Sequence, residues 1–493
     1  MAVAKRWTSR GLCAAVAALL LAGAAPAPPR VAVEGGAVEG VAAEGGALVF
    51  RGIPYAAPPL GELRWREPQP VRPWTGVRQA IATPPACPQN DHGWNSADAA
   101  RTSEDCLTLD IRTPGLGGRR PVMVWIHGGS NRAGSAAGTV ESRLTDRGAV
   151  VVAIQYRLGI LGFLAPEEAA VEGAAGNYGL MDQIAALRWV RDHIAKFGGD
   201  PDNITLFGES AGSQDVSLML AAPAAQGLFA RAIMQSGTPG FGMPFRTLAE
   251  AHAIAAQAQR LAGVRGLAQL RALPAARLLE IDRQLTDPSL HADDFMWLKT
   301  TVDGRVLPAS PRQLLAGAWP RPVIIGSNRA EFGSAEGTTD IAATLARVYG
   351  SRAGDARELY RFGEPGRDPR LGHPALEIET DWVFRCPAGE LAALLAGSGW
   401  PVWRYEFDLA PDGGLTSHAA EIPYVLDRRP IDKGVSLQDY WISFAQTGNP
   451  NGAALPAWPI TSPETPRHLA ITPQGLSVGQ DLRAELCALR DAI

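Results

Sequence analysis

The pentapeptide Gly208-Glu209-Ser210-Ala211-Gly212 is the segment of the chain best suited to covalent chemistry. A serine between two glycines on a sharp turn projects its hydroxyl from a sheet edge, because glycine has no side chain to obstruct the approach of a substrate. A helix that begins directly after the turn points its N-terminal dipole at the negative charge that forms during attack on a carbonyl. We therefore predict that Ser210 is the nucleophile of an acyl-transfer reaction. The alternative is a glycine-rich strand–helix turn without activity.

Acyl transfer also needs backbone N–H groups that bind the oxyanion of the tetrahedral intermediate. The segment His127-Gly128-Gly129-Ser130 follows an apolar run and precedes the serine turn, in the chain order that such sites use. Paired glycines allow the backbone to approach a substrate closely. We expect the N–H groups of Gly128, Gly129 and Ala211 to be the donors. The alternative is that the glycine pair only ends a strand.

A serine nucleophile needs a histidine base, which in this chain order follows the serine. Position disfavours five histidines, since three precede Ser210 and two lie in a helical or polar stretch well before the C-terminal part: His92, His127, His193, His252 and His291. His373, His418 and His468 remain. His418 lies in a loop after the strand-like residues 402–407, and loops after strands often carry catalytic groups. Position favours His418 and leaves the other two open.

The acid partner of that histidine holds the imidazole in one tautomer and stabilises its charged form. Glu331 lies just beyond the strand-like residues 323–325, and Glu336 and Asp340 are competitors. A solvated surface carboxylate is the common alternative for each of them. Sequence position leaves the choice among the three open.

Several short apolar runs predict the strands that must position these groups. Residues 121–126, 150–156, 204–207 and 323–325 are typical of buried strands in a mainly parallel sheet. Helical spacing of apolar residues predicts helices over 181–197 and 215–221, with a turn at 200–203 between the first helix and the next strand. Residues 246–320 and 340–400 are mostly helical in pattern, and we expect them to form the lid and flanks of a pocket. The alternation predicts an α/β fold with helices flanking a parallel sheet.

Composition sets broad limits on the function of the 493-residue chain. Hydrophobic residues make up 46% and charged residues 19%, which is typical of a globular protein with a large core. A sequence pI near 6.1 gives no indication of the basic surface that nucleic-acid binding requires. The cysteines form no CxxC pair, so neither a structural zinc site nor a redox dithiol is expected, and no other metal or cofactor is implied. The expected partner is a small-molecule substrate, and the oligomeric state stays undetermined.

The N-terminus has the pattern of an export signal. Lys5, Arg6 and Arg10 precede an apolar stretch of 12 residues, 11–22, which is too short to span a bilayer as a helix. Small residues then offer A-x-A cleavage sites near 24–27. We therefore predict a signal peptide over 1–25, a secreted or periplasmic location and a single domain over 26–493, since no linker-like segment divides it. The alternative is an uncleaved membrane anchor.

The cysteine count agrees with export. Cys13 lies in the signal segment, which leaves Cys87, Cys106, Cys386 and Cys487, an even number. Four cysteines allow three pairings, and sequence position alone does not choose among them. The alternative is four free buried thiols.

The chain resembles the type-B carboxylesterase family, which includes cholinesterases, bacterial para-nitrobenzyl esterases and the non-catalytic neuroligins. The resemblance runs from about residue 31 to the C-terminus and is carried by nine motifs in the family's order: RGIPYAAPPLGELRW (51–65), SEDCLTLDI (103–111), VMVWIHGG (122–129), the segment 177–213 ending in FGGDPDNITLFGESAGS, MQSG (234–237), VDGRVLP (302–308), GSNRAEF (326–332), SHAAEIPYV (417–425) and FAQTGNPN (444–451). It implies an α/β-hydrolase fold with helical lid insertions.

Carried over residue by residue, the resemblance implies a catalytic triad of Ser210, Glu331 and His418. It further implies disulfides Cys87–Cys106 and Cys386–Cys487, and a buried polar network beside the triad that includes Glu209 and Ser236. The implied activity is hydrolysis of carboxylic esters through an acyl-enzyme intermediate, without a cofactor or metal. The alternatives are an amidase, lactonase or polyester hydrolase that uses the same triad, and a neuroligin-like binding protein, which the presence of Ser210 disfavours.

Two features depart from the family pattern. Trp94 is similar to the aromatic residue that holds the choline ammonium in cholinesterases, but the segment from Trp94 to Cys106 is two residues longer here. We favour a pocket-rim aromatic for neutral esters over a cation-binding one. Ser130 stands where many relatives carry an apolar residue, and a small polar residue there is expected to widen or polarise the pocket mouth.

Overall fold

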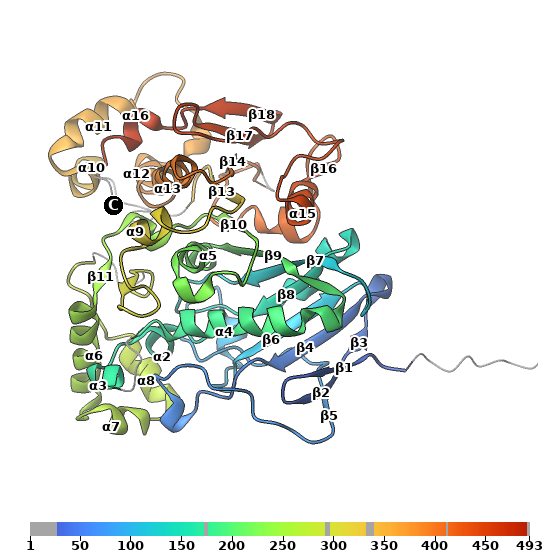
Figure 1. Ribbon diagram of the computed structural model, residues 1–493. Helices are drawn as coiled ribbons and strands as arrows, with labels where there is room; N and C mark the ends of the chain where they lie inside the picture. Colours follow the sequence, from blue (N-terminus) through green and yellow to red (C-terminus); the bar gives the residue numbers. More distant parts are fainter. Residues whose placement is uncertain (1–26, 172–175, 291–295, 332–339, 411–412, 491–493) are drawn as a thin grey trace, which may run out of the picture.

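The computed structural model describes residues 27–171, 176–290, 296–331, 340–410 and 413–490 (Figure 1). The predicted signal peptide, the disfavoured His291 and the competing acid Glu336 lie outside these ranges. Within them, no helix is both long and apolar enough to cross a membrane.

An 11-stranded sheet crosses the molecule in the order β18-β17-β14-β13-β10-β9-β7-β8-β6-β4-β3. The strands from β8 to β17 in this order pair in parallel, and the strands outside them pair antiparallel. In chain order the strands are β3 (Val41–Ala42), β4 (Leu48–Pro54), β6 (Thr108–Thr113), β7 (Arg120–Ile126), β8 (Val150–Ile154), β9 (Gly199–Glu209), β10 (Arg231–Gln235), β13 (Val323–Asn328), β14 (Val402–Phe407), β17 (Arg467–Thr472) and β18 (Gly475–Gln480).

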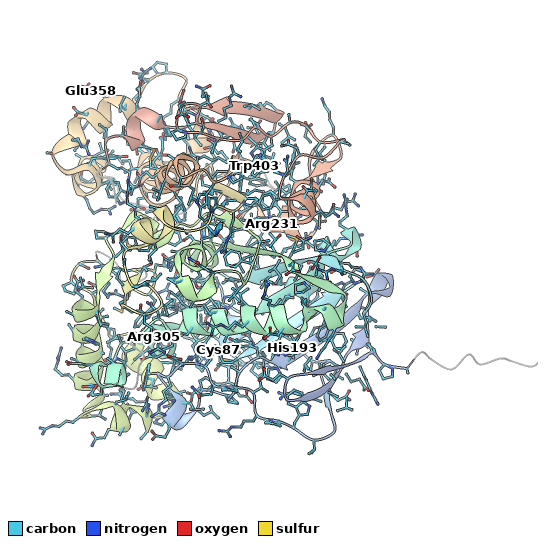
Figure 2. The ribbon with its side chains drawn as sticks, in the orientation of Figure 1. Cys87, His193, Arg231, Arg305, Glu358 and Trp403 are labelled. Atoms are coloured by element: carbon cyan, nitrogen blue, oxygen red, sulfur yellow. A yellow bond between two sulfur atoms is a disulfide. The ribbon has the colours of Figure 1, made fainter. Side chains whose placement is uncertain are left out.

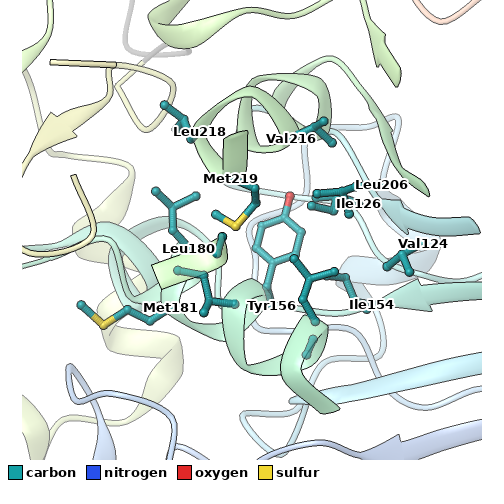
Figure 3. Close-up of a cluster of buried hydrophobic side chains, with 14 of the residues drawn as sticks. Val124, Ile126, Ile154, Tyr156, Leu180, Met181, Leu206, Val216, Leu218 and Met219 are labelled. Carbon is teal, nitrogen blue, oxygen red and sulfur yellow. The ribbon is translucent and has the colours of Figure 1, made fainter. Parts of the chain in front are cut away.

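Helices cover both faces of this sheet because successive strand residues point to opposite faces. Val122, Val124 and Ile126 of β7 pack in a cluster with residues of α4 (Tyr178–His193) and α5 (Ala211–Ala221). Figure 3 shows part of that cluster, with Tyr156 among Ile126, Ile154 and Met219. The intervening Met123 and Trp125 belong to a second cluster, with residues of α15 (Leu437–Thr447) on the other face. Trp403 of β14, labelled in Figure 2, lies in this second cluster, and its ring centroid is 5.9 Å from that of Phe444 in α15.

Residues 246–320 and 340–400 contain two groups of helices, as the sequence predicts. Their role as the lid and flanks of a pocket stays a prediction. The first contains α6 (Leu248–Ala262), α7 (Leu267–Arg271), α8 (Ala275–Asp282) and α9 (Pro311–Ala316). The second contains α10 (Ile341–Tyr349), α11 (Ala353–Tyr360), α12 (Pro374–Glu379), the π-helical segment Thr380–Arg385 and α13 (Cys386–Gly397). α10, α11 and α12 share a separate small core with α16 (Ala484–Cys487), at the upper left of Figure 1.

The smaller elements are short. They are β1 (Arg30–Val33), β2 (Gly36–Glu39), β5 (Val77–Gln79), β11 (Arg246–Thr247), β12 (Thr301–Val302), β15 (Pro430–Asp432), β16 (Val435–Ser436), α1 (Ser96–Ala99), α2 (Gly159–Phe163), α3 (Glu167–Val171) and α14 (Ile422–Leu426).

The predicted elements are present, but several boundaries differ. The predicted turn at 200–203 is wrong, because these residues lie inside β9, where they bulge between the pairs Arg120–Gly199 and Val122–Ile204. The helix predicted over 181–197 begins earlier, at Tyr178, and its last turn is a 3-10 helix, Ile194–Phe197. β13 does not stop at Gly326. A Cβ atom there would lie 2.0 Å from the ring of Tyr405, so this glycine makes room for an aromatic ring on the neighbouring strand and does not break its own.

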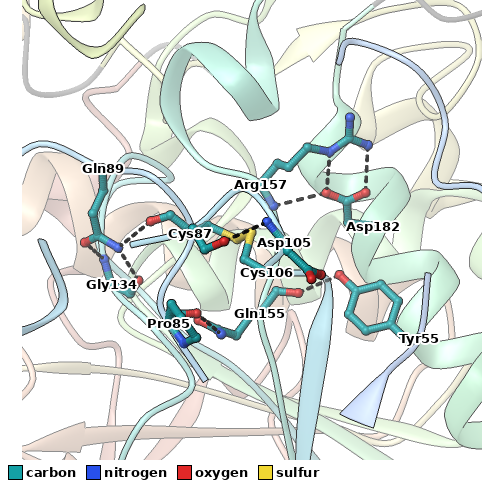
Figure 4. Close-up of a disulfide and its surroundings, with 11 residues drawn as sticks. Tyr55, Pro85, Cys87, Gln89, Asp105, Cys106, Gly134, Gln155, Arg157 and Asp182 are labelled. Atoms are coloured by element: carbon teal, nitrogen blue, oxygen red, sulfur yellow. Dashed lines mark hydrogen bonds and ion pairs between the residues drawn. A yellow bond between two sulfur atoms is a disulfide. The ribbon is translucent and has the colours of Figure 1, made fainter. Parts of the chain in front are cut away.

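Disulfides join Cys87 to Cys106 and Cys386 to Cys487, which is the pairing implied by the resemblance. Figure 4 shows the first of them beside the paired side chains of Arg157 and Asp182. The second ties the start of α13 to the end of α16, across 101 residues of chain. In the chain-entropy description, a cross-link over a loop of about 100 residues stabilises the fold by about 4.7 kcal/mol and one over a loop of about 20 residues by about 3 kcal/mol.

Candidate active site

Ser210 occupies a one-residue turn between β9 and α5. Its φ of 56° and ψ of −126° lie outside the helical and strand regions, a strained conformation that persists only when the surroundings fix it. Both of its backbone polar groups are hydrogen-bonded. The N–H donates to the carbonyl oxygen of Gln235 at 2.9 Å, and the carbonyl accepts the N–H of Gln214 at 2.9 Å. The turn is therefore anchored to β10 on one side and to α5 on the other.

Glycines surround this turn because neighbouring backbone leaves no room for side chains. A Cβ atom at Gly212 would lie 2.1 Å from the carbonyl oxygen of Ile126, at the end of β7. A Cβ atom at Gly128 would lie 2.8 Å from the carbonyl oxygen of Glu209 and 3.0 Å from Cβ of Ser210. The segment after β7 and the serine turn are thus in backbone contact, as an oxyanion site requires.

Residues 128–131, called the glycine turn below, have an unusual backbone. Gly129, Ser130 and Asn131 have φ values of 109°, 58° and 55°. The carbonyl of Gly129 accepts the N–H groups of Arg132 and Ala133, which closes the turn. Within the described residues, the N–H groups of Gly128, Gly129, Ser130 and Ala211 have no recorded protein acceptor. Unpaired amides on two adjoining segments are what anion binding demands.

His418 contacts two buried carboxylates. Its Nδ1 lies 2.7 Å from Oε2 of Glu331, and its Nε2 lies 3.1 Å from Oε1 of Glu209, the residue before Ser210. The ring also packs against Phe384, at 5.1 Å between ring centroids. The structure therefore brings together the histidine and the glutamate that the resemblance implied, within reach of the serine turn.

Hydrogen bonds fix both the side chain and the backbone of Glu331. Its other carboxylate oxygen, Oε1, accepts the N–H of Asn328 at 2.6 Å, and its own N–H donates to Oγ1 of Thr380 at 3.1 Å. Its side chain is buried. The competing Asp340 instead caps α10, where Oδ1 accepts the N–H of Ala343 at 2.9 Å.

Burial and charge act on the titratable groups in opposite directions. Burial raises the pKa of Glu209 to about 8. Burial alone would lower the pKa of His418, but the carboxylates of Glu209 and Glu331 stabilise its protonated form and raise its pKa to about 9. Ser236, expected in the same polar network, is buried directly after β10, and its Oγ makes no hydrogen bond to the described residues, so its place in the network stays a prediction.

The other candidate histidines have structural surroundings. His373 caps α12 through the N–H of Ala375. His468 lies within β17, where burial lowers its pKa to about 4. His252 contacts the carbonyl oxygen of Ala165 at 2.9 Å.

Sequence reasoning missed three residues of this site. Glu421 is fully buried, and its carboxylate accepts hydrogen bonds from Gln235 at 3.1 Å and from Asn328 at 2.7 Å. Thr380 and Phe384 come from the π-helical segment, which supports Glu331 and His418 together. Glu421 lies three residues after His418 in the same motif, so the motif was a signal for it. The π-helical segment left no comparable pattern.

An apolar wall adjoins the serine turn. Ala211, Phe241, Leu298 and Phe384 form one buried cluster, with Met243 and Val383 packed against it. Trp94 lies beside the glycine turn: it is 62% exposed, and Cη2 of its ring would be 3.1 Å from a Cβ atom at Gly129. An apolar wall beside unpaired amides suits the acyl group of an ester, and an exposed indole suits a rim.

The described residues contain no cluster of three or more histidine, cysteine, aspartate or glutamate side chains placed to hold a metal ion.

The model of the carboxylesterase family matches residues 27–343 and 339–490. The chain belongs to the carboxylesterase family.

Individual family members agree with this assignment. Liver carboxylesterase 1 of Oryctolagus cuniculus is 34% identical over 522 residues, which cover 92% of this chain and 91% of that protein. The medium-chain fatty acyl-CoA hydrolase precursor of Anas platyrhynchos is 35% identical over 511 residues, covering 91% and 89%. Among solved structures, a PNB esterase superposes with a TM-score of 0.80 at 33% identity, covering 94% of this chain and 100% of that one. The chain is thus a carboxylic-ester hydrolase with the α/β-hydrolase fold, as the sequence predicts.

Proposed function

We propose that this carboxylesterase cleaves esters through an acyl-enzyme formed on Ser210, with His418 as the general base and Glu331 as its acid partner. The observation that carries the proposal is the meeting of three segments at one sheet edge. The strained serine turn, the His418–Glu331 pair at 2.7 Å and the unpaired amides of the glycine turn all lie within backbone or side-chain contact of Glu209 or Ser210.

In the first step, Oγ of Ser210 attacks the carbonyl carbon while His418 takes its proton. The carbonyl oxygen becomes an oxyanion, which the N–H groups of Gly128, Gly129 and Ala211 stabilise. Ser130 offers a further unpaired N–H on the same turn. His418 then gives the proton to the leaving alcohol, and the C–O bond breaks. The acyl group remains on Ser210.

In the second step, water attacks the acyl-enzyme and His418 takes a proton from it. The second tetrahedral intermediate collapses, the proton returns to Oγ of Ser210, and the carboxylic acid leaves. Glu331 holds the Nδ1–H tautomer throughout. Glu209 lies beside the opposite ring nitrogen, so its negative charge favours the imidazolium that forms in both steps.

We propose in addition that residues 1–25 are an export signal and that residues 26–493 are one domain in a secreted or periplasmic enzyme. Two disulfides support an oxidising location. The family match runs from residue 27 almost to the C-terminus, which supports one domain that begins after the signal.

Labelling with a fluorophosphonate probe tests the nucleophile. We expect the wild type to bind one equivalent of probe and to lose esterase activity in proportion, while Ser210→Ala binds none. Ser217→Ala, a buried serine later on the same helix, is the matched control and should label as the wild type does. Labelling of Ser210→Ala, or retention of more than a tenth of the wild-type esterase activity, would show that another residue is the nucleophile.

A panel of paired substrates tests the bond that is cleaved. Aryl and alkyl esters are compared with amides of the same acyl group. We expect hydrolysis of the esters and little of the amides, since the family members named above are esterases and thioester hydrolases. Faster hydrolysis of the amides would assign the enzyme to amide substrates on the same triad.

A further inference from the structure

Helix α5 carries a second group that bears on the oxyanion site. Ala211, its first residue, provides one of the proposed oxyanion donors, and Asp215 follows one helical turn later. Asp215 is fully buried, with 0% of its surface exposed. Its Oδ1 accepts a hydrogen bond from Nδ2 of Asn131 at 3.1 Å, and its Oδ2 accepts one from Nε2 of Gln183 at 2.5 Å.

Asn131 is the last residue of the glycine turn. It has a left-handed backbone with φ of 55°, and its carbonyl accepts the N–H of Gly159 at 2.7 Å. Its side-chain oxygen lies 3.4 Å from the hydroxyl of Tyr156, and that hydroxyl donates to the carbonyl of His127 at 2.7 Å. A series of hydrogen bonds therefore runs from Asp215 to Asn131, at the end of the glycine turn, and through Tyr156 to His127, which directly precedes the turn.

The surroundings of Asp215 are uncharged. Within the described residues no cation is paired with it, and the donors that face it are the amide groups of Gln183, Asn131 and Gln214. Burial consequently raises its pKa to about 7. Burying a carboxyl group without a paired cation costs free energy of folding. Hydrogen bonds offset part of this cost, and a satisfied buried network makes the segments that it joins rigid.

We propose that Asp215 is a positioning residue that fixes the glycine turn relative to the N–H of Ala211, through its hydrogen bond to Asn131. This inference rests on the proposed oxyanion role of these amides. One rigid helix then sets both parts of the oxyanion site. Ala211 contributes its own N–H, and Asp215 holds the two-residue left-handed stretch, Ser130 and Asn131, that aims the other donors. A turn with three successive positive φ values would otherwise relax toward lower strain.

The test uses two truncations, a conservative variant and a matched control. Asp215→Ala and Asn131→Ala each remove one end of the link. Asp215→Asn keeps an oxygen for Asn131, and its new NH₂ group faces Gln183, whose buried Oε1 has no recorded partner and can accept it after the amide rotates. Ser217→Ala removes a buried hydrogen bond of α5 that runs to the carbonyl of Gln214 and does not reach the glycine turn.

The measurements are kcat and KM on p-nitrophenyl acetate per titrated active site, the inhibition constant of a trifluoromethyl ketone, and Tm. For Asp215→Ala and Asn131→Ala we expect kcat to fall about 10- to 100-fold with KM changed less than threefold. The affinity for the ketone, which forms an oxyanion on the serine, should fall by the same factor as kcat/KM. Asp215→Asn and Ser217→Ala should keep kcat within threefold. The double variant Asp215→Ala/Asn131→Ala should lose no more than the worse single variant.

Two results would overturn the inference. One is a folded Asp215→Ala with kcat within threefold of the wild type. The other is losses in the double variant that multiply, because then Asp215 does not act through Asn131. A merely structural role would lower Tm in Asp215→Ala and leave the ratio of ketone affinity to substrate KM unchanged. Failure of the proposed function is distinguishable, since in that case Ser210→Ala would retain activity and the wild type would fail to titrate with the ketone.

Discussion

The two halves of the site are built from different materials. The half that precedes Ser210 in the chain is the glycine turn, in which unpaired backbone amides are the proposed functional groups. The half that follows consists of Glu331 and His418, in which side chains are the proposed functional groups. Each half lies beside one disulfide. Cys87 is two residues from Gln89, which binds the glycine-turn side, and Cys386 directly follows the π-helical segment that supports Glu331.

The halves are also held by different forces. On the glycine-turn side, the amide of Gln89 pairs with both the N–H and the carbonyl of Gly134, at 2.8 and 2.9 Å. On the histidine side, the guanidinium of Arg385 donates to Glu406 at 3.0 Å and to the carbonyl of Arg329 at 2.6 Å. Amide hydrogen bonds therefore stabilise the glycine-turn side, where the carboxyl group of Asp215 binds the Asn131 amide without a paired cation among the described residues. Buried ion pairs stabilise the histidine side, which contains the ionisable groups Glu331 and His418.

The two halves should respond differently to amino-acid replacements. A side-chain group is lost completely when its residue is replaced, whereas a backbone N–H is kept in every substitution except that by proline and is only displaced. We therefore expect replacements in the histidine half to abolish the reaction, and replacements in the glycine-turn half to weaken it by graded amounts.

The largest effect is expected for His418→Ala. The variant has no base for Ser210 and no acid for the leaving alcohol, so kcat should fall by about 10⁴- to 10⁶-fold. Stopped assays on p-nitrophenyl acetate at pH 8 measure this loss. His373→Ala, an exposed histidine at the start of α12, should change kcat less than twofold. A loss of less than a hundredfold in His418→Ala would place the base elsewhere.

A smaller loss is expected for Gly128→Ala. The new methyl group would lie 2.8 Å from the carbonyl oxygen of Glu209, so the glycine turn must shift away from the serine turn. Displaced donors should lower kcat by about 100-fold. Steady-state kinetics measure the loss. Gly354→Ala, in α11 with open space around it, is the control and should leave kcat unchanged. Equal activity of both variants would contradict the role of this turn.

Gln89→Ala should lower kcat less again, because it removes the hydrogen bonds to Gly134, a neighbour of Gly128 outside the glycine turn, and leaves the donors in place. We expect kcat to fall by about tenfold, the loss for a hydrogen-bonded support worth about 1.4 kcal/mol. Gln438→Ala removes a buried glutamine that donates to Leu426 on the other face of the sheet. We measure kcat and Tm of both variants. For a similar loss of Tm, a larger loss of kcat in Gln89→Ala shows a specific effect on the turn. If both glutamines lower kcat equally, Gln89 has no specific effect on the turn.

The smallest effect is a shift of the pH profile in Glu209→Gln. The enzyme needs neutral His418, so activity falls as the pH drops through the pKa of this histidine. The Glu209 carboxylate raises that pKa because it stabilises the imidazolium. Its replacement should move the acidic limb of kcat/KM to lower pH by about one unit. Glu358→Gln, an exposed glutamate of α11 labelled in Figure 2, should leave the limb in place. A shift to higher pH would contradict the assigned sign.

Much of the fold was predictable, because it depends on short segments. The apolar runs predicted β7, β8 and β13, and helical spacing predicted α4 and most of α5. The wrong turn at 200–203 shows the limit. Residues such as Asp200-Pro201-Asp202-Asn203 favour a turn locally, and only pairing with β7 keeps them within a strand as a bulge.

The site was predictable in part. Position left three histidines and three acids open, and only the resemblance selected His418 and Glu331. Glu421, Thr380 and the links Gln89–Gly134 and Asp215–Asn131 were missed. These contacts join amides or carboxyls that are tens of residues apart, and such pairs leave no periodicity in the sequence.

The serine turn could be recognised in the sequence because its signals are close together: an apolar strand, two glycines on either side of the serine, and a helix that begins at Ala211. The reason for one of the glycines is tertiary, since a Cβ atom at Gly212 would meet the carbonyl oxygen of Ile126 in β7. The side chains that contact this turn depend on the arrangement of the strands. Glu331 and His418 are 87 residues apart and follow β13 and β14. These two strands pair in parallel, so the segments after them leave the sheet at the same edge. The order of strands in the sheet, and no local preference of either residue, brings the two side chains within hydrogen-bond distance.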